Sequence, residues 1–191
     1  MTSSAPVHTS ALSLDEILAR RRSMREFAPS PLTDAEVHRL LWAGQGVTDA
    51  EGRRTAPSTG AQYAIELYAV TPSAIVRYVP ATDDVAAIAA GSRRSDLQAA
   101  AAGQECVGQA PVSIVIAGVV SRLEARYGGH AHGYLLLEAG HVGQNILLEA
   151  VALGLGAVPC AKFDAGAVAA VLGLPGDQVP LEIIPVGHPK E

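Results

Sequence analysis

The sequence predicts an α+β fold, and two observations support that prediction. Segments whose apolar residues recur at helical spacing are interrupted by short β-rich runs, without the strict strand–helix–strand alternation of a parallel sheet. The longest apolar run, at 110–120, has the length of a buried strand and is too short to cross a membrane. At 191 residues the chain is long enough for one domain with a substantial core. We therefore expect a single domain over residues 14–191 and a flexible N-terminal tail over residues 1–13.

The composition favours an assembly of several subunits. Hydrophobic residues make up 49% of the chain and charged residues only 17%. Because so few charges cover the outside, some apolar surface should lie against another subunit, and we expect a homo-oligomer. The formal net charge of −5 argues against a nucleic-acid binder. The chain start lacks the pattern of a secretion signal, and two cysteines 54 positions apart are typical of reduced thiols, so a cytoplasmic location is expected.

Two capped helices and a loop are expected in the N-terminal third. Ser13 precedes an amphipathic stretch and is followed three places later by Glu16, the spacing at which a capping box forms. Thr33 and Glu36 repeat this spacing before a second amphipathic stretch. Residues 46–60 are too rich in Gly, Pro, Ser and Thr for a regular element, so they are expected to form a loop.

The middle of the chain is expected to contain a hairpin followed by helices. Residues 65–70 and 74–79 are rich in β-formers and are separated by a short turn. Residues 82–108 are rich in alanine, which predicts helices broken at Gly91 and Gly103. The elements expected after them are a buried strand at 111–119, a short helix near 121–126, a loop at 127–133, a long helix from 134 to about 153, a short strand or loop at 157–163, a capped helix at 164–174 and a final strand at 181–189.

Four arginines near the start of this acidic chain could form a small anion site. The stretch RRRSMREF at 20–27 contains Arg20, Arg21, Arg22 and Arg25. A solvated helix end, a nucleic-acid contact and an anion site are the three interpretations. The overall charge argues against nucleic acid. The stretch by itself does not decide between the remaining two.

Other polar clusters favour structural roles over chemistry. Glu138, His141 and Asn145 share one face of the long helix, and His130 and His132 lie in the loop before it. No metal-binding spacing accompanies them, so buried, hydrogen-bonded polar groups are favoured and no metal is expected. The stretch GLGAVP follows a helix and lacks a third glycine, which favours a helix C-cap over a dinucleotide site.

Four motifs, in order, resemble the nitroreductase family. They are RRRSMREF, APSTGAQYAIELYAV, HVGQNILLEAVALGLGAVPCAKFD and LEIIPVGHP. The sequence is most similar to the compact branch that includes azoline dehydrogenases of the SagB and ThcOx type. The resemblance covers nearly all of the chain from residue 14 onwards. It implies a nitroreductase-like fold with a central, mostly antiparallel sheet flanked by helices. It further implies an intertwined homodimer, the long helix at about 134–153 at its interface, and one FMN at each of two interface sites.

The resemblance assigns the arginine stretch to the cofactor. Arg21, Ser23 and Arg25 match a family motif of arginine, serine and a basic residue that holds the FMN phosphate and ribityl chain. Guanidinium groups are suited to that task because they form charge-assisted hydrogen bonds with phosphate oxygens. Arg22 lies in the same motif and is a further cofactor-binding candidate, although its side chain alternates away and is expected at the surface. Arg20 is still interpreted as part of a solvated helix end.

A second motif matches the family loop that reaches across from the other subunit to the flavin ring. Pro57, Ser58, Thr59, Gly60 and Gln62 occupy it. The loop is one residue shorter than the commonest form, and Gly60 stands where many members have Asn. A backbone contact to the flavin is therefore expected there.

A third motif places a peptide N–H against flavin N5. Ala161 and Lys162 occupy the position in question, and any residue other than proline supplies that N–H. A donor held at N5 favours the reduced flavin. Lys190, near the C-terminus, is a candidate phosphate ligand.

The function expected from the resemblance is that of an FMN-dependent oxidoreductase using NAD(P)H and a small-molecule substrate. Such enzymes need few catalytic side chains because the cofactor performs the chemistry. The alternative is an azoline dehydrogenase, whose members carry a Lys-Tyr pair where this chain has Arg126 and Tyr127. Arginine stays protonated and cannot act as a base, which leaves Tyr127 as the catalytic candidate. A non-catalytic flavin-binding member is the third possibility, since aromatic residues make up only 4% of the chain.

Overall fold

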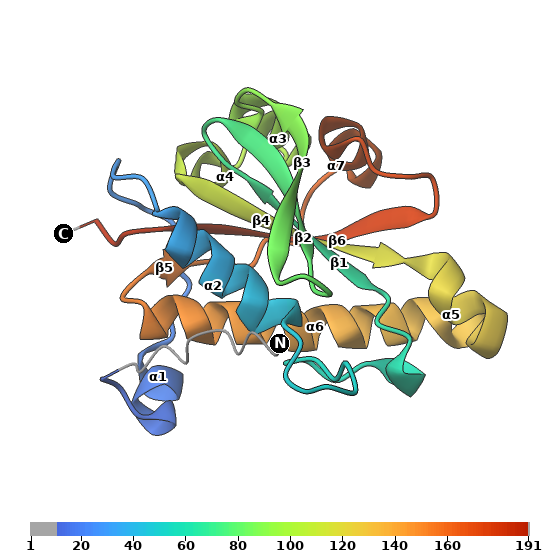
Figure 1. Ribbon diagram of the computed structural model, residues 1–191. Helices are drawn as coiled ribbons and strands as arrows, with labels where there is room; N and C mark the ends of the chain where they lie inside the picture. The colour runs from blue at the N-terminus through green and yellow to red at the C-terminus, as the bar shows by residue number, and fades with distance from the viewer. Residues whose placement is uncertain (1–10, 191) are drawn as a thin grey trace.

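A six-stranded antiparallel sheet forms the centre of the molecule (Figure 1). The structure, a computed structural model, describes residues 11–190. Every pair of neighbouring strands is antiparallel, in the order β3-β2-β1-β4-β6-β5. Most of the predicted N-terminal tail thus lies outside the described residues. The strands are β1 Ile65–Val70, β2 Ala74–Val79, β3 Asp84–Ala90, β4 Val112–Val119, β5 Gly156–Ala157 and β6 Gln178–Gly187.

Helices cover both faces of the sheet, which confirms the predicted α+β architecture. α2 and α6 pack on one face, and α3, α4 and α7 pack on the other (Figure 1). α6 is the longest helix, with 22 residues. No helix in the described part of the chain is long and apolar enough to cross a membrane. The helices are α1 Leu14–Arg20, α2 Asp34–Gln45, α3 Arg94–Ala100, α4 Glu105–Gln109, α5 Val120–Tyr127, α6 Ala131–Ala152 and α7 Ala165–Leu172, with 3-10 turns at Thr59–Ala61 and Gly128–His130.

The two central strands explain why the sequence shows continuous apolar runs there. Every residue of β1 and β4 is buried, because each strand has a helical layer on both faces. Leu67 pairs with Ile116 and points into the core under α6. Tyr68 pairs with Val115 and points into the core under α7. The predicted hairpin of β1 and β2 is also confirmed.

Local signals placed the helix ends correctly. The Ser13 hydroxyl accepts from the Glu16 backbone N–H at 3.3 Å, and the Glu16 carboxylate accepts from the Ser13 N–H at 2.8 Å. Thr33 and Glu36 form the same reciprocal pair at the start of α2. Gly154 has φ +73° just after α6, which confirms the helix C-cap predicted for GLGAVP.

Two predictions of secondary structure were wrong. Residues 84–90 form strand β3 and not a helix, because pairing with β2 overrides the helical propensity of alanine. Helix is confined there to α3 and α4, with breaks at the predicted Gly91 and Gly103, both at positive φ. The expected loop at 127–133 is largely helical, since a 3-10 turn leads directly into α6 at Ala131.

Candidate functional site

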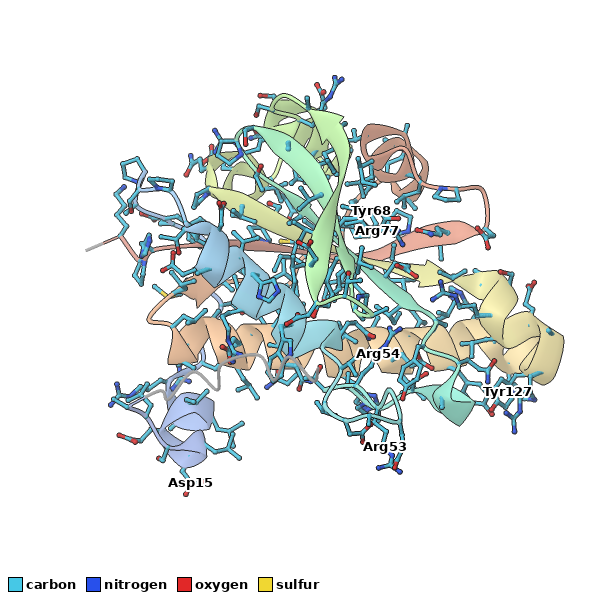
Figure 2. The ribbon with its side chains drawn as sticks, in the orientation of Figure 1. Asp15, Arg53, Arg54, Tyr68, Arg77 and Tyr127 are labelled. Carbon is cyan, nitrogen blue, oxygen red and sulfur yellow. The ribbon has the colours of Figure 1, made fainter. Side chains whose placement is uncertain are left out.

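The predicted site residues gather at opposite ends of α6. The arginine stretch lies beside the C-terminal end, where Arg21 and Val151 line one hollow. The 57–62 loop lies near the N-terminal end, on Glu138. From Glu138 to Val151 a helix rises by roughly 20 Å. Figure 2 shows this separation, with Asp15 of α1 below one end of α6 and Tyr127 at the other.

The arginine stretch is held along the short strand β5. Ser23 forms a bridge with Ala157, and the Met24 N–H donates to the Ala157 carbonyl at 3.0 Å. The Arg22 guanidinium donates to the carbonyls of Ala19 and Arg21, at 2.9 and 2.7 Å. Arg22 therefore caps the C-terminal end of α1, and it also lines the hollow that Arg21 borders.

Arg21 and Arg25 carry guanidinium groups that lack partners. Within residues 11–190 neither side chain makes a hydrogen bond or an ion pair. Arg21 borders a hollow of about 250 Å³ at the end of α6, and Arg25 borders a second hollow of about 480 Å³. Lys190 lines the second hollow as well, and its ammonium lies 3.5 Å from the Glu26 carboxylate. Positive charge thus flanks the stretch on both sides.

The Ala161–Lys162 peptide lies beside the second hollow. Gln104, which lines that hollow, donates from its side-chain amide to the Lys162 carbonyl at 2.8 Å. The preceding residue, Cys160, is fixed to β6 by two backbone hydrogen bonds with Ile183, at 2.8 and 3.0 Å. The N–H groups of Ala161 and Lys162 donate to nothing in the described chain. A rigid segment therefore presents free backbone donors.

The 57–62 loop is anchored by one buried carboxylate. Glu138, only 3% exposed, accepts from the Ser58 hydroxyl at 3.2 Å and from the Thr59 N–H at 2.7 Å through the same oxygen. The Ser58 hydroxyl oxygen also accepts from the Tyr63 N–H at 2.7 Å. Glu138 thereby fixes the middle of the loop, a role that the sequence did not reveal. The buried, hydrogen-bonded interpretation of the helix-face polar groups is confirmed for Glu138.

The backbone of this loop is strained and tightly packed. Gly60, Ala61 and Tyr63 have φ of +57°, +54° and +47°, in the left-handed region that residues with a side chain avoid. A Cβ at Gly60 would collide with the hydroxyl of Tyr127. A side chain at position 60 would therefore displace Tyr127, and the close contact places Tyr127 against the predicted flavin-contacting residues.

Three further polar contacts hold the chain leading into the loop. Arg54 donates to the Gln45 side chain at 2.6 Å and stacks its guanidinium 4.4 Å from the centre of the Tyr63 ring. Burial lowers the pKa of Arg54 from its usual value. Asn145 of α6 donates to the Thr55 carbonyl at 3.2 Å, which again confirms a structural role. In the described residues no three His, Cys, Asp or Glu side chains cluster as metal ligands.

Aromatic groups gather around Tyr127. The Tyr127 and Tyr134 rings meet edge to face at 5.2 Å, and His130 stacks on Tyr134 at 6.1 Å. The Arg126 guanidinium lies 5.5 Å from the centre of the Tyr127 ring. These contacts give Tyr127 a defined place beside the loop, at the far end of α6 from the arginine stretch.

One half-buried carboxyl group, that of Glu182, has no hydrogen-bond partner within residues 11–190. A bulge in the pairing of β4 with β6 turns Leu181 and Glu182 towards α6, where the Glu182 carboxylate lies against Gly143. Burial raises the pKa of Glu182 to about 7. Within residues 11–190 its oxygens accept no hydrogen bond.

Comparisons with known proteins agree on one family. A model described as the nitroreductase family matches residues 18–188. A nitroreductase-family protein of Methanocaldococcus jannaschii is 34% identical over 186 residues, which span 94% of this chain and 93% of that protein. A solved nitroreductase-family structure from Ralstonia eutropha JMP134 has a TM-score of 0.88 at 29% identity, covering 97% of this chain and 87% of that one. In the E. coli microcin synthetase McbBCD complex, one chain shares the fold, with a TM-score of 0.78 at 20% identity over 100% of this chain and 79% of that chain.

Proposed function

Because the chain belongs to the nitroreductase family, we propose that it is an FMN-dependent oxidoreductase. It passes a hydride through flavin N5 between NAD(P)H or another organic donor and a small organic acceptor. It acts as a homodimer in the cytoplasm. The observation that carries the proposal is the set of unpaired donors around the arginine stretch and the Ala161–Lys162 segment.

The residues present fit FMN. A phosphate group needs charge-assisted donors, and Arg21, Arg25 and the hydroxyl of Ser23 supply them without competition from other acceptors in the described chain. The free N–H of Lys162 is fixed by the hydrogen bonds of Cys160 and Gln104. When bound, FMN supplies a site that accepts and returns a hydride. A fixed N–H donor beside that site stabilises the negative charge of the reduced ring.

A homodimer explains why the two groups of residues lie at opposite ends of α6. The outer face of α6 carries Leu136 and Leu137, which are 50% and 61% exposed. α1 adds Leu14 and Leu18, 63% and 49% exposed. Such an apolar face is what a dimer interface buries. A two-fold axis across α6 would bring the 57–62 loop of one subunit to the arginine stretch of its partner.

Azoline dehydrogenation is the second candidate function, and one contact favours it. The Tyr127 hydroxyl packs against Gly60, inside the loop proposed to meet the flavin of the other subunit. A hydroxyl there can hold or move the proton that a ring dehydrogenation releases. Restoring the Lys-Tyr pair with Arg126→Lys should raise the rate on a thiazoline peptide if this function operates. An unchanged rate, together with full activity of Tyr127→Phe, would exclude it.

Anaerobic reduction of the purified protein tests the main proposal. The protein reconstituted with FMN should be yellow, should release a flavin with one phosphate, and should bleach on addition of NADPH or NADH. A colourless protein that retains no FMN would overturn the proposal. A yellow protein that neither pyridine nucleotide bleaches would restrict it to an organic donor or to a non-catalytic flavin-binding role.

A further inference from the structure

The two cysteines of the chain meet in the core although 54 positions separate them. The sulfur atoms of Cys106 and Cys160 lie 4.0 Å apart. Both thiols are free and buried, with 7% and 5% exposure. A disulfide bond is about 2.05 Å long, so an approach of about 2 Å would join them.

The two cysteines lie on segments of unequal rigidity. Cys160 is fixed to β6 through both its N–H and its carbonyl, which pair with Ile183. Cys106 lies on α4, a helix of five residues only. A helix this short has few internal hydrogen bonds to resist displacement. Closing the pair would therefore move α4 towards Cys160.

α4 borders the second hollow, which is also lined by Arg25, a residue proposed above to hold the FMN phosphate. Cys106 lines that hollow together with Arg25 and Lys190. Gln104, immediately before α4, donates to the Lys162 carbonyl. A shift of α4 would move Gln104 as well and break its hydrogen bond to the Lys162 carbonyl, so the peptide whose N–H groups are free would lose one of its supports.

We propose that Cys106 and Cys160 form an oxidation-sensitive dithiol, which a hydroperoxide converts into a disulfide that weakens flavin binding. The Cys106 sulfur attacks the peroxide, the O–O bond breaks, and a sulfenic acid forms with release of water or an alcohol. The Cys160 sulfur then bonds to the Cys106 sulfur, and the sulfenic oxygen leaves as water with the Cys160 proton. Two thiols are oxidised and one peroxide is reduced, so atoms and electrons balance.

The order of the two steps follows from the surroundings of each thiol. Burial, together with the neighbouring Cys106, raises the pKa of the Cys160 thiol to about 12. Cys160 therefore stays protonated at neutral pH and is a poor first nucleophile. Cys106 lines the hollow, through which a small peroxide can reach it.

Mass spectrometry of the full chain tests the disulfide. The reduced, folded protein is treated with hydrogen peroxide, then unfolded in an alkylating reagent and digested. We expect a loss of about 2 Da and a cross-linked peptide pair containing Cys106 and Cys160. In Cys160→Ser, dimedone should label Cys106, whereas in Cys106→Ser it should leave Cys160 unlabelled. Oxygen adducts without a cross-link, or two thiols that stay alkylatable, would overturn the proposal.

The effect on flavin binding rests on the proposed function and is measured separately. We expect the FMN dissociation constant of the oxidised protein to be at least about threefold higher than that of the reduced protein. Cys106→Ser, treated in the same way, should show no change. If the oxidised and reduced wild-type proteins have the same FMN dissociation constant, the disulfide does not affect flavin binding and this part of the proposal is overturned. If the reduced protein binds no FMN, the proposed function is wrong. The cross-link experiment still tests whether Cys106 and Cys160 form a disulfide.

Discussion

The two ends of α6 hold opposite kinds of polar chemistry. At the C-terminal end, the Arg21 and Arg25 guanidinium groups and the Lys162 N–H donate to no group in the described chain. At the N-terminal end, Ser58 and Thr59 both donate to the buried Glu138. The region at the C-terminal end of α6 therefore has free donors for an anionic ligand. At the N-terminal end, the hydrogen bonds to Glu138 hold the strained loop without a ligand. The contrast supports the proposal that each chain supplies two different halves of a flavin site, one that binds the anionic cofactor and one that is ordered without it.

Removing the unpaired arginines should have the largest effect. The double variant Arg21→Ala, Arg25→Ala should weaken FMN binding at least about a hundredfold, because each charged hydrogen bond contributes about 1.5–3 kcal/mol. Fluorescence quenching of FMN measures the affinity. Arg53→Ala with Arg93→Ala is the matched control, since it removes two exposed, ion-paired arginines. If both double variants bind FMN alike, the phosphate assignment is wrong.

Removing the anchor at the other end should cost stability. Glu138→Ala leaves the Ser58 hydroxyl and the Thr59 N–H without their acceptor, so we expect the free energy of unfolding to fall by about 2–3 kcal/mol. Glu138→Gln retains an acceptor oxygen and should lose about 1 kcal/mol or less. Urea unfolding followed by fluorescence of the single tryptophan, Trp42, measures both. Equal losses in the two variants would show that the hydrogen bonds do not hold the loop.

Replacing Glu182, which has no hydrogen-bond partner in the described chain, should change how the free energy of unfolding depends on pH. Burial raises its pKa from 4.5 to about 7 in the folded protein, so folding favours its protonated form. That stabilisation is complete at low pH and is lost as the pH rises through about 7. Compared with Glu182→Gln, the wild-type protein should therefore lose stability between pH 5 and 8. If the urea midpoints of the two proteins differ by the same amount at every pH between 5 and 8, the raised pKa of Glu182 is contradicted.

The sequence predicted the features that depend on neighbouring residues. Both capping boxes lie within three positions, and their residue types suffice to specify them. Strand β3 was missed because its conformation depends on pairing with β2, which overrides the local preference of alanine.

In the candidate site, too, features set by neighbouring residues were predicted from the sequence, and contacts between distant residues were not. The arginine stretch could be proposed as a cofactor site from the sequence because its motif is continuous along the chain. The role of Glu138 was not recognisable, because its hydrogen bonds reach residues about 80 positions away. The tight contact of Gly60 with Tyr127 likewise joins positions that are distant in the sequence.

A mixed dimer tests most directly the claim that each flavin site combines two subunits. One chain carries Arg21→Ala with Arg25→Ala, and the other carries Gly60→Trp, whose bulk would distort the loop. The arginine variant alone should bind FMN at least about a hundredfold more weakly than the wild type, and Gly60→Trp alone at least about tenfold more weakly. In the mixed dimer one site combines both defects and the other combines two intact halves, so native mass spectrometry should find one FMN per dimer. A mixed dimer that retains no FMN would contradict the account, because it would place each site within a single chain.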